Sequence, residues 1–415
     1  MSKILEMIDR MCPAGVEYAS LEQLGSFYGG LTGKSKNDFK EGNAVFITYM
    51  NVYSNPALNL DVTDTVKIGE GEKQNVVHKG DILFTGSSET PDECGMSSVV
   101  LIEPETASYL NSFCFGYRFN DIETFDLVFL KHLFRSAEVR KAIKGTANGV
   151  TRFNVSKARF AKIEIPVPPL EVQREIGKVL DNFSELTAEL TAELTARKKQ
   201  YEFYRKSLLT FDPEDDTVEW PTVSLLFDMR NGYTPSKSNS AFWNNGTIPW
   251  FRMEDIRENG RILYEAIQSI HPSAVKGKGL FKANSIILAT SATIGEHALV
   301  KVDCLTNQRF TCLTPKASWQ KKIDIMYIYF YMFLVDDWCK AHINQGNFAG
   351  VDMVAFNQLQ IPIPTLTEQK RIVVILDKLE ALTTSLSEGL PAEIKARQQQ
   401  YEFYRDQLLT FKRYI

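Results

Sequence analysis

The chain lacks the features that mark membrane-spanning, secreted and metal-binding proteins. Its longest apolar run, residues 325–335, has eleven residues, which is too short to cross a bilayer and predicts a buried helix. Glu6, Asp9 and Arg10 interrupt the start of the chain where a secretory signal needs an apolar core. The six cysteines form no CxxC pair, and the five histidines show no ligand spacing. We therefore expect a reduced, cytoplasmic protein that binds no metal.

Positive charge is also scarce over the chain as a whole. There are 47 Lys and Arg residues against 51 Asp and Glu, which gives a net charge of −4. This balance provides no global attraction for nucleic acid, so any such binding has to be local. The 415 residues are 44% hydrophobic and 24% charged, which is typical of a soluble protein of two or three domains.

Complete catalytic motifs are missing too. Gly33-Lys34-Ser35 resembles the end of a phosphate-binding loop, but that motif needs a glycine where Tyr28 stands. Residues 55–58 resemble an adenine-methylating tetrapeptide without its second proline and its aromatic residue. Turns explain both better, and we expect no catalytic residue and no cofactor. A DNA-modifying enzyme, methyltransferase or nuclease, with an unrecognised site is the alternative.

The chain does contain a tandem duplication. Residues 197–211 recur as residues 397–411, with eleven of the fifteen positions identical. Upstream of each copy, residues 165–181 match residues 361–377, including their prolines and one glutamine. Such an internal repeat points to a unit used twice. Two copies, each with its own conserved arm, suggest a protein that grips a two-part target.

Each half is expected to hold one globular unit and one helical arm. Short apolar runs at residues 81–84 and 285–288 align with each other and are typical of buried strands. Apolar helices are expected at residues 126–143 and 324–343, near the end of each unit. This pattern predicts an α+β fold. The expected ranges, in the order unit, arm, unit, arm, are 1–162, 163–212, 213–360 and 361–415.

The arms give the clearest helical pattern. The first, residues 171–211, spans about 60 Å if it is fully helical. The second contains Gly389-Leu390-Pro391, a stop followed by a start, and is expected to form two helices. Two Thr-Ala-Glu-Leu units occupy residues 187–194. They are either ordinary helix filler or an adjustable spacer between the units, each adding about 6 Å.

Local positive charge is found in the first unit. Residues 140–162 carry seven basic side chains and no acidic one, as phosphate binding requires. A solvated helix face explains the cluster nearly as well. Residues 85–88 add hydroxyl groups suited to base edges. The DNA-contact candidates of the first unit are Lys34, Lys36, Ser87, Arg140, Lys144, Arg152 and Lys157.

The second unit is less basic, and polar loops carry its candidates. Residues 290–293 and 307–309 supply side chains that can both donate and accept hydrogen bonds, which base reading requires. The DNA-contact candidates of the second unit are Lys237, Arg252, Ser291, Asn307, Gln308 and Arg309.

Taken together, two divergent units, each followed by an IPVP or IPIP stop, a leucine–glutamine arm start and a YEFYR arm end, resemble the specificity subunit of type I restriction–modification systems. Some members of that family carry the same Thr-Ala-Glu-Leu repeat in the same place. The resemblance covers essentially the whole chain and is strongest in the arms. The two arms differ in length, which departs from strict symmetry in the docking of partners.

The resemblance implies that each unit is a target recognition domain for one half of a split double-stranded DNA sequence. It also implies that the two arms pack as an antiparallel coiled coil with pseudo-two-fold symmetry and dock two methylation subunits. Those partners use S-adenosylmethionine, and a motor-nuclease restriction subunit uses ATP and magnesium. A coiled-coil assembly protein without a DNA role is a third possibility. The partner-binding candidates are Tyr201, Phe203, Tyr204, Leu208, Tyr401, Phe403, Tyr404 and Leu408.

Overall fold

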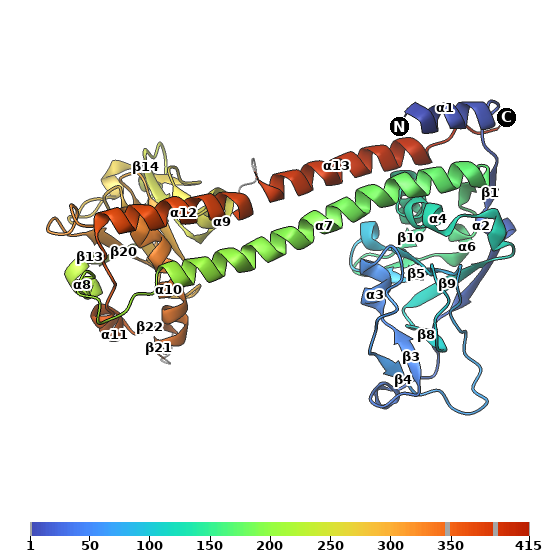
Figure 1. The fold of residues 1–415 in the computed structure, drawn as a ribbon, viewed down its shortest axis with the longest axis horizontal. Helices are drawn as coiled ribbons and strands as arrows, with labels where there is room; N and C mark the ends of the chain where they lie inside the picture. The colour runs from blue at the N-terminus through green and yellow to red at the C-terminus, as the bar shows by residue number, and fades with distance from the viewer. Residues whose placement is uncertain (1, 345–348, 385–388, 415) are drawn as a thin grey trace. The chain divides into compact units, whose positions relative to one another are not determined.

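A computed structural model describes residues 2–344, 349–384 and 389–414 of the chain (Figure 1). Its contacts divide into two compact units. Unit 1 comprises residues 1–192 with 393–415, and unit 2 comprises residues 193–392. Helices and strands occur in both, so the predicted α+β class is confirmed. The predicted boundaries at residues 162, 212 and 360 stay predictions.

Unit 1 is built on a four-stranded antiparallel sheet in the order β2-β9-β5-β7. The strand predicted at residues 81–84 is β5 at its centre, and all four of its side chains are buried. Its strands are β2 (Gly25–Gly29), β5 (Ile82–Thr85), β7 (Ser97–Val99) and β9 (Cys114–Phe119).

Smaller sheets complete unit 1: β4-β3-β8, β10-β11-β6 and β1-β12. Their strands are β1 (Tyr18–Ser20), β3 (Ala44–Ile47), β4 (Thr65–Val66), β6 (Ser87–Ser88), β8 (Ser108–Leu110), β10 (Ala147–Asn148), β11 (Phe153–Val155) and β12 (Glu164–Pro166). Its helices are α1 (Ser2–Met11), α2 (Leu21–Leu24), α3 (Tyr49–Ser54), α4 (Leu127–Leu133), α5 (Ala137–Gly145) and α6 (Lys157–Phe160).

The single helix predicted at residues 126–143 is wrong, because α4 and α5 are separate. Ser136 lies between them in an extended conformation, with φ −69° and ψ 154°. Its hydroxyl donates to the carbonyl oxygen of Leu133 at 2.7 Å. A serine that bonds to nearby backbone in this way competes with helix continuation.

Unit 2 repeats the arrangement with a five-stranded sheet, β13-β20-β17-β18-β15. The strand predicted at residues 285–288 is β17, again buried at the centre. The strands are β13 (Phe227–Asn231), β14 (Ile248–Phe251), β15 (Ile262–Leu263), β16 (Ser269–Ile270), β17 (Ser285–Ala289), β18 (His297–Val300), β19 (Leu305–Thr306), β20 (Phe310–Pro315), β21 (Ile343–Asn344) and β22 (Gly350–Val351). The short helices are α8 (Val223–Leu226), α9 (Met253–Asn259) and α11 (Met353–Gln358), and the predicted helix at residues 324–343 is confirmed as α10 (Ile325–Ala341).

The arms are helical as predicted. The first is α7 (Leu170–Leu208), a continuous helix of 39 residues that runs from unit 1 into unit 2. The second is divided into α12 (Leu366–Thr384) and α13 (Leu390–Leu409). Gly389, just before α13, has a φ of +89° that favours glycine, and so the predicted break is confirmed. Residues 385–388 lie outside the described part of the chain.

Within each unit, the two arms pack against each other with opposite chain directions (Figure 1). In unit 1, the rings of Phe183 on α7 and Tyr404 on α13 lie 5.4 Å apart. In unit 2, Tyr201 of α7 is buried in the same core as Ile372 and Leu376 of α12. The apolar stripe of each arm is therefore covered by the other arm and by the globular unit beside it.

One repeated glutamine fastens each arm to its globular unit. The buried Gln173 accepts a hydrogen bond from the Asp126 amide at 2.9 Å and donates to the carbonyl oxygens of Thr124 and Pro168. Gln369, also buried, makes the corresponding three bonds in unit 2: to the Asp324 amide and to the carbonyls of residues 322 and 364. The glutamine that recurs in the sequence is thus a structural clamp used twice.

Among the residues that the structure describes, no helix is both long enough and apolar enough to cross a membrane.

Candidate nucleic-acid interface

Three loops meet at one edge of unit 1, although they are far apart in the sequence. The Asn111 amide donates to the carbonyl oxygen of Ile47 at 3.0 Å, which joins the loop before β9 to the end of β3. The Gly86 amide donates to the carbonyl oxygen of Phe113 at 2.7 Å, which brings in the loop after β5. The side chain of Asn111 accepts from the Phe113 amide and fixes the turn between them. Loops positioned by a rigid sheet are a common place for binding residues.

The same three-loop edge recurs in unit 2. The Asn307 amide donates to the carbonyl oxygen of Phe251 at 3.1 Å, and the Thr290 amide donates to that of Arg309 at 3.0 Å. The Asn307 side chain accepts from the Arg309 amide, as Asn111 does in unit 1. Arg309 therefore occupies the position that Phe113 holds in unit 1. The two units share a scaffold and differ in the side chains that it presents.

In unit 1, the structure brings together two of the predicted residues. The Arg152 guanidinium lies 3.3 Å from the hydroxyl of Ser87 and 5.2 Å from the ring centroid of Phe113. Ser87 is itself buried, and its hydroxyl accepts the hydrogen bond that positions Arg152. The predicted contacts Ser87 and Arg152 are neighbours that the sequence separates by 65 positions.

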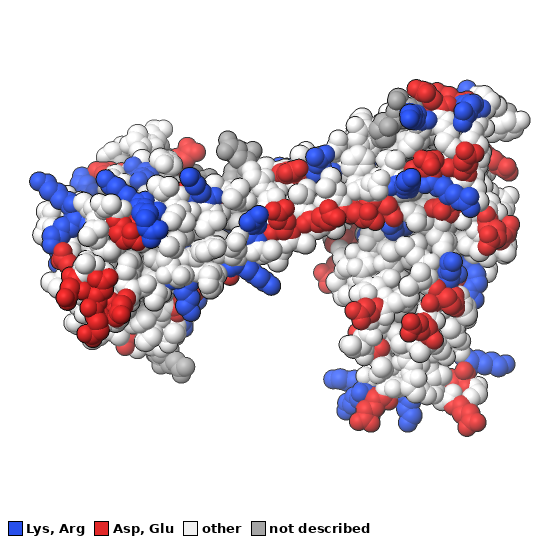
Figure 2. All heavy atoms as spheres, viewed as in Figure 1, with Lys and Arg blue, Asp and Glu red and all other residues white. Residues whose placement is uncertain are grey.

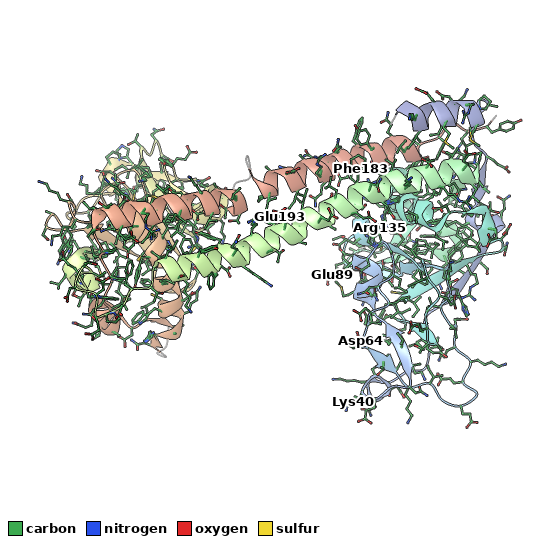
Figure 3. All side chains as sticks on the ribbon, viewed as in Figure 1. Lys40, Asp64, Glu89, Arg135, Phe183 and Glu193 are labelled. Atoms are coloured by element: carbon green, nitrogen blue, oxygen red, sulfur yellow. The ribbon has the colours of Figure 1, made fainter. Side chains whose placement is uncertain are left out.

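Beside Arg152 lies a hollow of about 490 Å³. Two serines of β6, two tyrosines of α3, Phe113 and two glutamates line it. Figure 3 shows one of these glutamates, Glu89, at the edge of unit 1 near α3. The hollow therefore combines aromatic surface with hydrogen-bonding groups.

The second glutamate of this hollow is held in its charged form. Glu93 accepts hydrogen bonds from the hydroxyls of Tyr53 at 2.8 Å and Ser88 at 3.0 Å. The Tyr53 bond, with help from Thr90 and Ser88, lowers the pKa of Glu93 below its ordinary value. With Arg152 on one side and a carboxylate on the other, the hollow has a hydrogen-bond donor and an acceptor in its lining.

The basic stretch of residues 140–162 separates into structural and surface cations. Arg140 donates to the carbonyl oxygens of Asp92, Cys94 and Gly95, and burial lowers the pKa of its guanidinium. Lys144 pairs with the carboxylate of Asp92, a partner from outside the stretch. The guanidinium of Arg140 therefore binds backbone carbonyl oxygens inside the unit.

Lys157, like Arg152, is exposed and lies over an aromatic ring. Its ammonium lies 5.4 Å from the ring centroid of Phe115, and the residue is exposed at the start of α6. An ammonium placed over an aromatic ring can still contact a phosphate.

Lys34 and Lys36 lie in another part of unit 1. The Lys34 ammonium is paired with Glu72 at 2.6 Å, and only 9% of its side chain is exposed. Lys36 is exposed in the turn that leads to Lys40. Figure 2 shows acidic and basic side chains mixed at this end of unit 1, and Figure 3 places Lys40 there, well away from Glu89. The structure does not bring these two lysines to the three-loop edge.

In unit 2, most of the predicted residues do meet. Ser291 and Asn307–Arg309 lie on two of the three loops, and Arg252 follows Phe251 on the third. Arg252 lies 5.6 Å from the ring centroid of Trp250. The Gln308 side chain accepts from the hydroxyl of Thr234 at 2.6 Å, which ties in the segment that carries Lys237.

A second hollow, of about 800 Å³, lies in unit 2. Arg230, Tyr233, Lys276 and Lys278 line it, with the Arg230 guanidinium bonded to the carbonyl oxygen of Gly279 at 3.0 Å. Sequence reasoning missed Arg230, Phe113 and the tyrosines of α3. Phe113 and the tyrosines meet Arg152 in unit 1, and Arg230 meets Lys278 in unit 2, through tertiary contacts that no local sequence pattern marks.

The middle of α7 carries negative charge instead. Glu185, Glu189 and Glu193 are exposed at four-residue spacing, and Figure 2 shows the acidic row along this helix. A row of carboxylates repels phosphates. In the described part of the chain, no group of three or more His, Cys, Asp or Glu residues is placed to hold a metal ion.

Comparison with known proteins assigns this architecture. The family model for the type I restriction modification DNA specificity domain matches residues 13–197 and again residues 217–396. The chain belongs to this family. The resemblance carried by the repeated sequence motifs is thereby confirmed.

The curated relatives of this specificity-domain protein share parts of its length. The specificity subunit of the EcoprrI type I restriction enzyme from Escherichia coli is 52% identical over 202 residues, 47% of this chain and 50% of the relative. The EcoR124I/EcoR124II specificity subunit, also from E. coli, is 40% identical over 271 residues, 62% and 65% of the two chains. A putative specificity subunit from Haemophilus influenzae is 34% identical over 279 residues, 63% and 68%. The chain thus matches between half and about two thirds of the length of these relatives.

Solved structures share the fold over nearly the whole chain. A chain from a study of complex assembly and conformational transition in the type I restriction–modification system superposes with a TM-score of 0.68 at 17% identity, covering 96% of this chain and 98% of that one. The HsdS subunit of Thermoanaerobacter tengcongensis gives a TM-score of 0.51 at 17% identity, with coverage of 96% and 97%. At this identity the likeness establishes the fold.

The repeated arm ends of this specificity-domain protein are partly buried. Tyr201 and Leu408 lie in the cores of unit 2 and unit 1, and Leu208 packs at the edge of the unit 2 core. Tyr401 donates or accepts a 2.9 Å hydrogen bond with His132, and Tyr404 packs on Phe183. These five predicted partner-binding residues make contacts within the chain.

Three residues of the arm ends face outward. Phe203 is 68% exposed and Phe403 is 63% exposed, at the same position of the two repeats. Tyr204, next to Phe203, is also exposed. Large exposed aromatic side chains in matched places are typical of a protein–protein contact surface.

Proposed function

We propose that the chain is the DNA sequence-specificity subunit of a type I restriction–modification complex, in which each globular unit binds one half of a bipartite double-stranded target. The observation that carries this proposal is the three-loop edge, which recurs on the same scaffold with different side chains. Two short half-sites read together discriminate far better than one, provided that the units are joined by a stiff connection.

Contacts at the two edges divide by chemistry. Arg152 and Lys157 in unit 1 are placed to bind phosphates, which supply affinity without sequence preference. Residues 307–309 in unit 2 offer an amide pair and a guanidinium, the groups that bind adenine and guanine edges in pairs. Lys36, Lys237, Arg252 and Ser291 are retained as further DNA contacts.

The arms supply the binding surface for partner subunits. Phe203 and Phe403 occupy equivalent positions, so two copies of one partner fit better than a single partner. We propose that these partners are methylation subunits, which hold S-adenosylmethionine and carry out adenine methylation, and that motor-nuclease restriction subunits join them. The chain itself directs the complex and catalyses no reaction.

Mapping of methylated adenines in cells with and without this chain tests the proposal. A split motif of two defined half-sequences with a fixed spacer is expected only when the chain is present. A methylation pattern that does not change when the chain is removed would contradict it.

A separate incubation distinguishes the enzyme alternative. The purified chain, without partners, is given DNA with S-adenosylmethionine or with magnesium. We expect neither methyl transfer nor cleavage, and turnover by the isolated chain would favour a DNA-modifying enzyme.

Replacement of the proposed phosphate contacts is expected to weaken DNA binding uniformly. R152A and K157A should each lower the affinity of the complex several-fold for every sequence and reduce the salt dependence by about one counterion. The measurement is fluorescence anisotropy over a salt series. K3A, at an exposed lysine of α1, is the matched control and should change nothing. Unaltered affinity in both variants would remove this basic surface from the interface.

Truncation of the exposed arm aromatics is expected to impair assembly. The double variant F203A/F403A should bind methylation subunits at least tenfold more weakly, because aromatic side chains that become buried on binding dominate protein interfaces. Isothermal titration with the purified partner measures this. Y264A removes an aromatic side chain that is 65% exposed elsewhere in unit 2 and should bind normally. Equal affinity of the double variant and this control would argue against the proposed surface.

A further inference from the structure

Unit 1 carries a tight hairpin whose tip is residues 149–152. Strands β10 and β11 pair with Ala147 opposite Val155, and β11 pairs onward with β6. Gly149 has a φ of +145°, and a Cβ built there would lie 1.9 Å from the carbonyl oxygen of Arg152. Only glycine fits this turn. The tip therefore has one defined backbone path.

Side chains from outside the tip hold the hairpin in place. At its base, the Arg159 guanidinium donates to the Asn148 side chain and to the carbonyl oxygen of Thr146 at 3.2 Å. At its other side, Arg152 is fixed by Ser87 and by the ring of Phe113. The hairpin is thus held at β10 by Arg159 and at its tip by the contacts of Arg152.

At this braced tip, Val150 is 90% exposed. A branched apolar side chain with little rotational freedom stands in solvent, beside the exposed Thr151. Thr151 and Arg152 also line the hollow of about 490 Å³, together with the exposed Met50. The tip of the hairpin therefore exposes one apolar side chain, Val150, next to the cation Arg152.

We infer that the β10–β11 hairpin enters the major groove of the half-site bound by unit 1 and that Val150 contacts the C5-methyl group of a thymine there. This inference rests on the proposed function. The major groove, about 12 Å wide, admits a two-stranded ribbon and is the groove that displays the thymine methyl.

The flanking charges fit the same placement. Arg152 lies two positions after Val150 and Lys157 begins α6 just after β11, and both are exposed cations that the phosphate backbone attracts. The contact with Val150 adds sequence preference to a binding energy that phosphates supply. An exposed apolar side chain could instead contact a protein partner, and binding of V150A to methylation subunits distinguishes that case from a DNA contact.

Thymine-to-uracil replacement tests the inference, because uracil lacks only the methyl group. The full complex of the chain with its methylation subunits is titrated with duplexes in which each thymine of the mapped target is replaced in turn. One replacement, in one half-site, is expected to weaken binding about fourfold, the effect of one buried methyl group. V150A should bind the thymine and uracil duplexes equally.

V354A is the matched control, because Val354 is a 79% exposed valine in unit 2. Its complex should keep the wild-type response to every replacement. A wild-type complex that responds to no thymine replacement, or a V150A complex that keeps the response, overturns the inference. Loss of methylation-subunit binding in V150A overturns it in favour of a protein contact. Failure of the proposed function looks different, because the wild-type complex then shows no sequence-specific binding at all.

Discussion

Insertion of one more Thr-Ala-Glu-Leu unit after Leu194 is expected to lengthen the spacer of the recognised DNA by one or two base pairs and to leave both half-sequences unchanged. The existing units, residues 187–194, lie inside the continuous helix α7, which runs from one unit into the other. Four helical residues add about 6 Å, and a duplex rises about 3.4 Å per base pair. Adenine-methylation mapping of cells that express the insertion variant measures the new spacer, and methylation at the original target should be lost.

The control for this experiment changes composition and keeps length. The double variant E189Q/E193Q alters the charge of both repeats but adds no residue, so its spacer should equal that of the wild type. An insertion variant that still methylates the original target would show that α7 does not set the spacing. A change in either half-sequence would show that the insertion disturbs the globular units.

Replacement of the clamp glutamine is expected to cause the largest loss of stability. In Q173L, the Asp126 amide and two carbonyl oxygens lose their partner while Leu fills the same buried space. Unsatisfied buried polar groups cost about 1–3 kcal/mol each, so we expect a loss of at least about 3 kcal/mol. Urea unfolding, followed together with hydrogen exchange of unit 1, measures it.

The two units provide an internal comparison for this prediction. Q369L should destabilise unit 2 to a similar extent, because Gln369 makes the corresponding bonds. Q407L, at an exposed glutamine of α13, should stay within about 0.5 kcal/mol of the wild type. Exchange rates near residues 124–126 that do not change in Q173L would refute the clamp.

Local patterns predicted the arms and the central strands. The spacing of apolar residues in the first arm and the prolines before it predicted a helix over residues 171–211, and α7 is Leu170–Leu208. Gly389 marks the break in the second arm. The strands β5 and β17 are buried on both faces, which fits the continuous apolar runs at residues 82–84 and 286–288 within them. The helix predicted at residues 126–143 failed at Ser136, whose hydroxyl bonds back to Leu133.

The candidate site was predicted less completely. Basic residues cluster in the stretch 140–162, but the sequence could not show that Arg140 is occupied by carbonyl oxygens or that Asp92 pairs with Lys144. Both contacts are made by a loop that lies 45 to 52 positions earlier in the chain. Phe113 joins the site through strand pairing alone, and its local sequence gives no sign of this.

The sequence by itself determined that this protein is a duplicated α+β unit with helical arms, because repetition and periodicity are properties of neighbouring residues. It also determined the family, since the motifs that carry the resemblance lie in those arms. Only the tertiary structure decided which polar side chains form hydrogen bonds inside each unit and which face solvent. Hydrogen bonding and burial depend on residues brought together from distant positions, and a linear pattern does not contain that information.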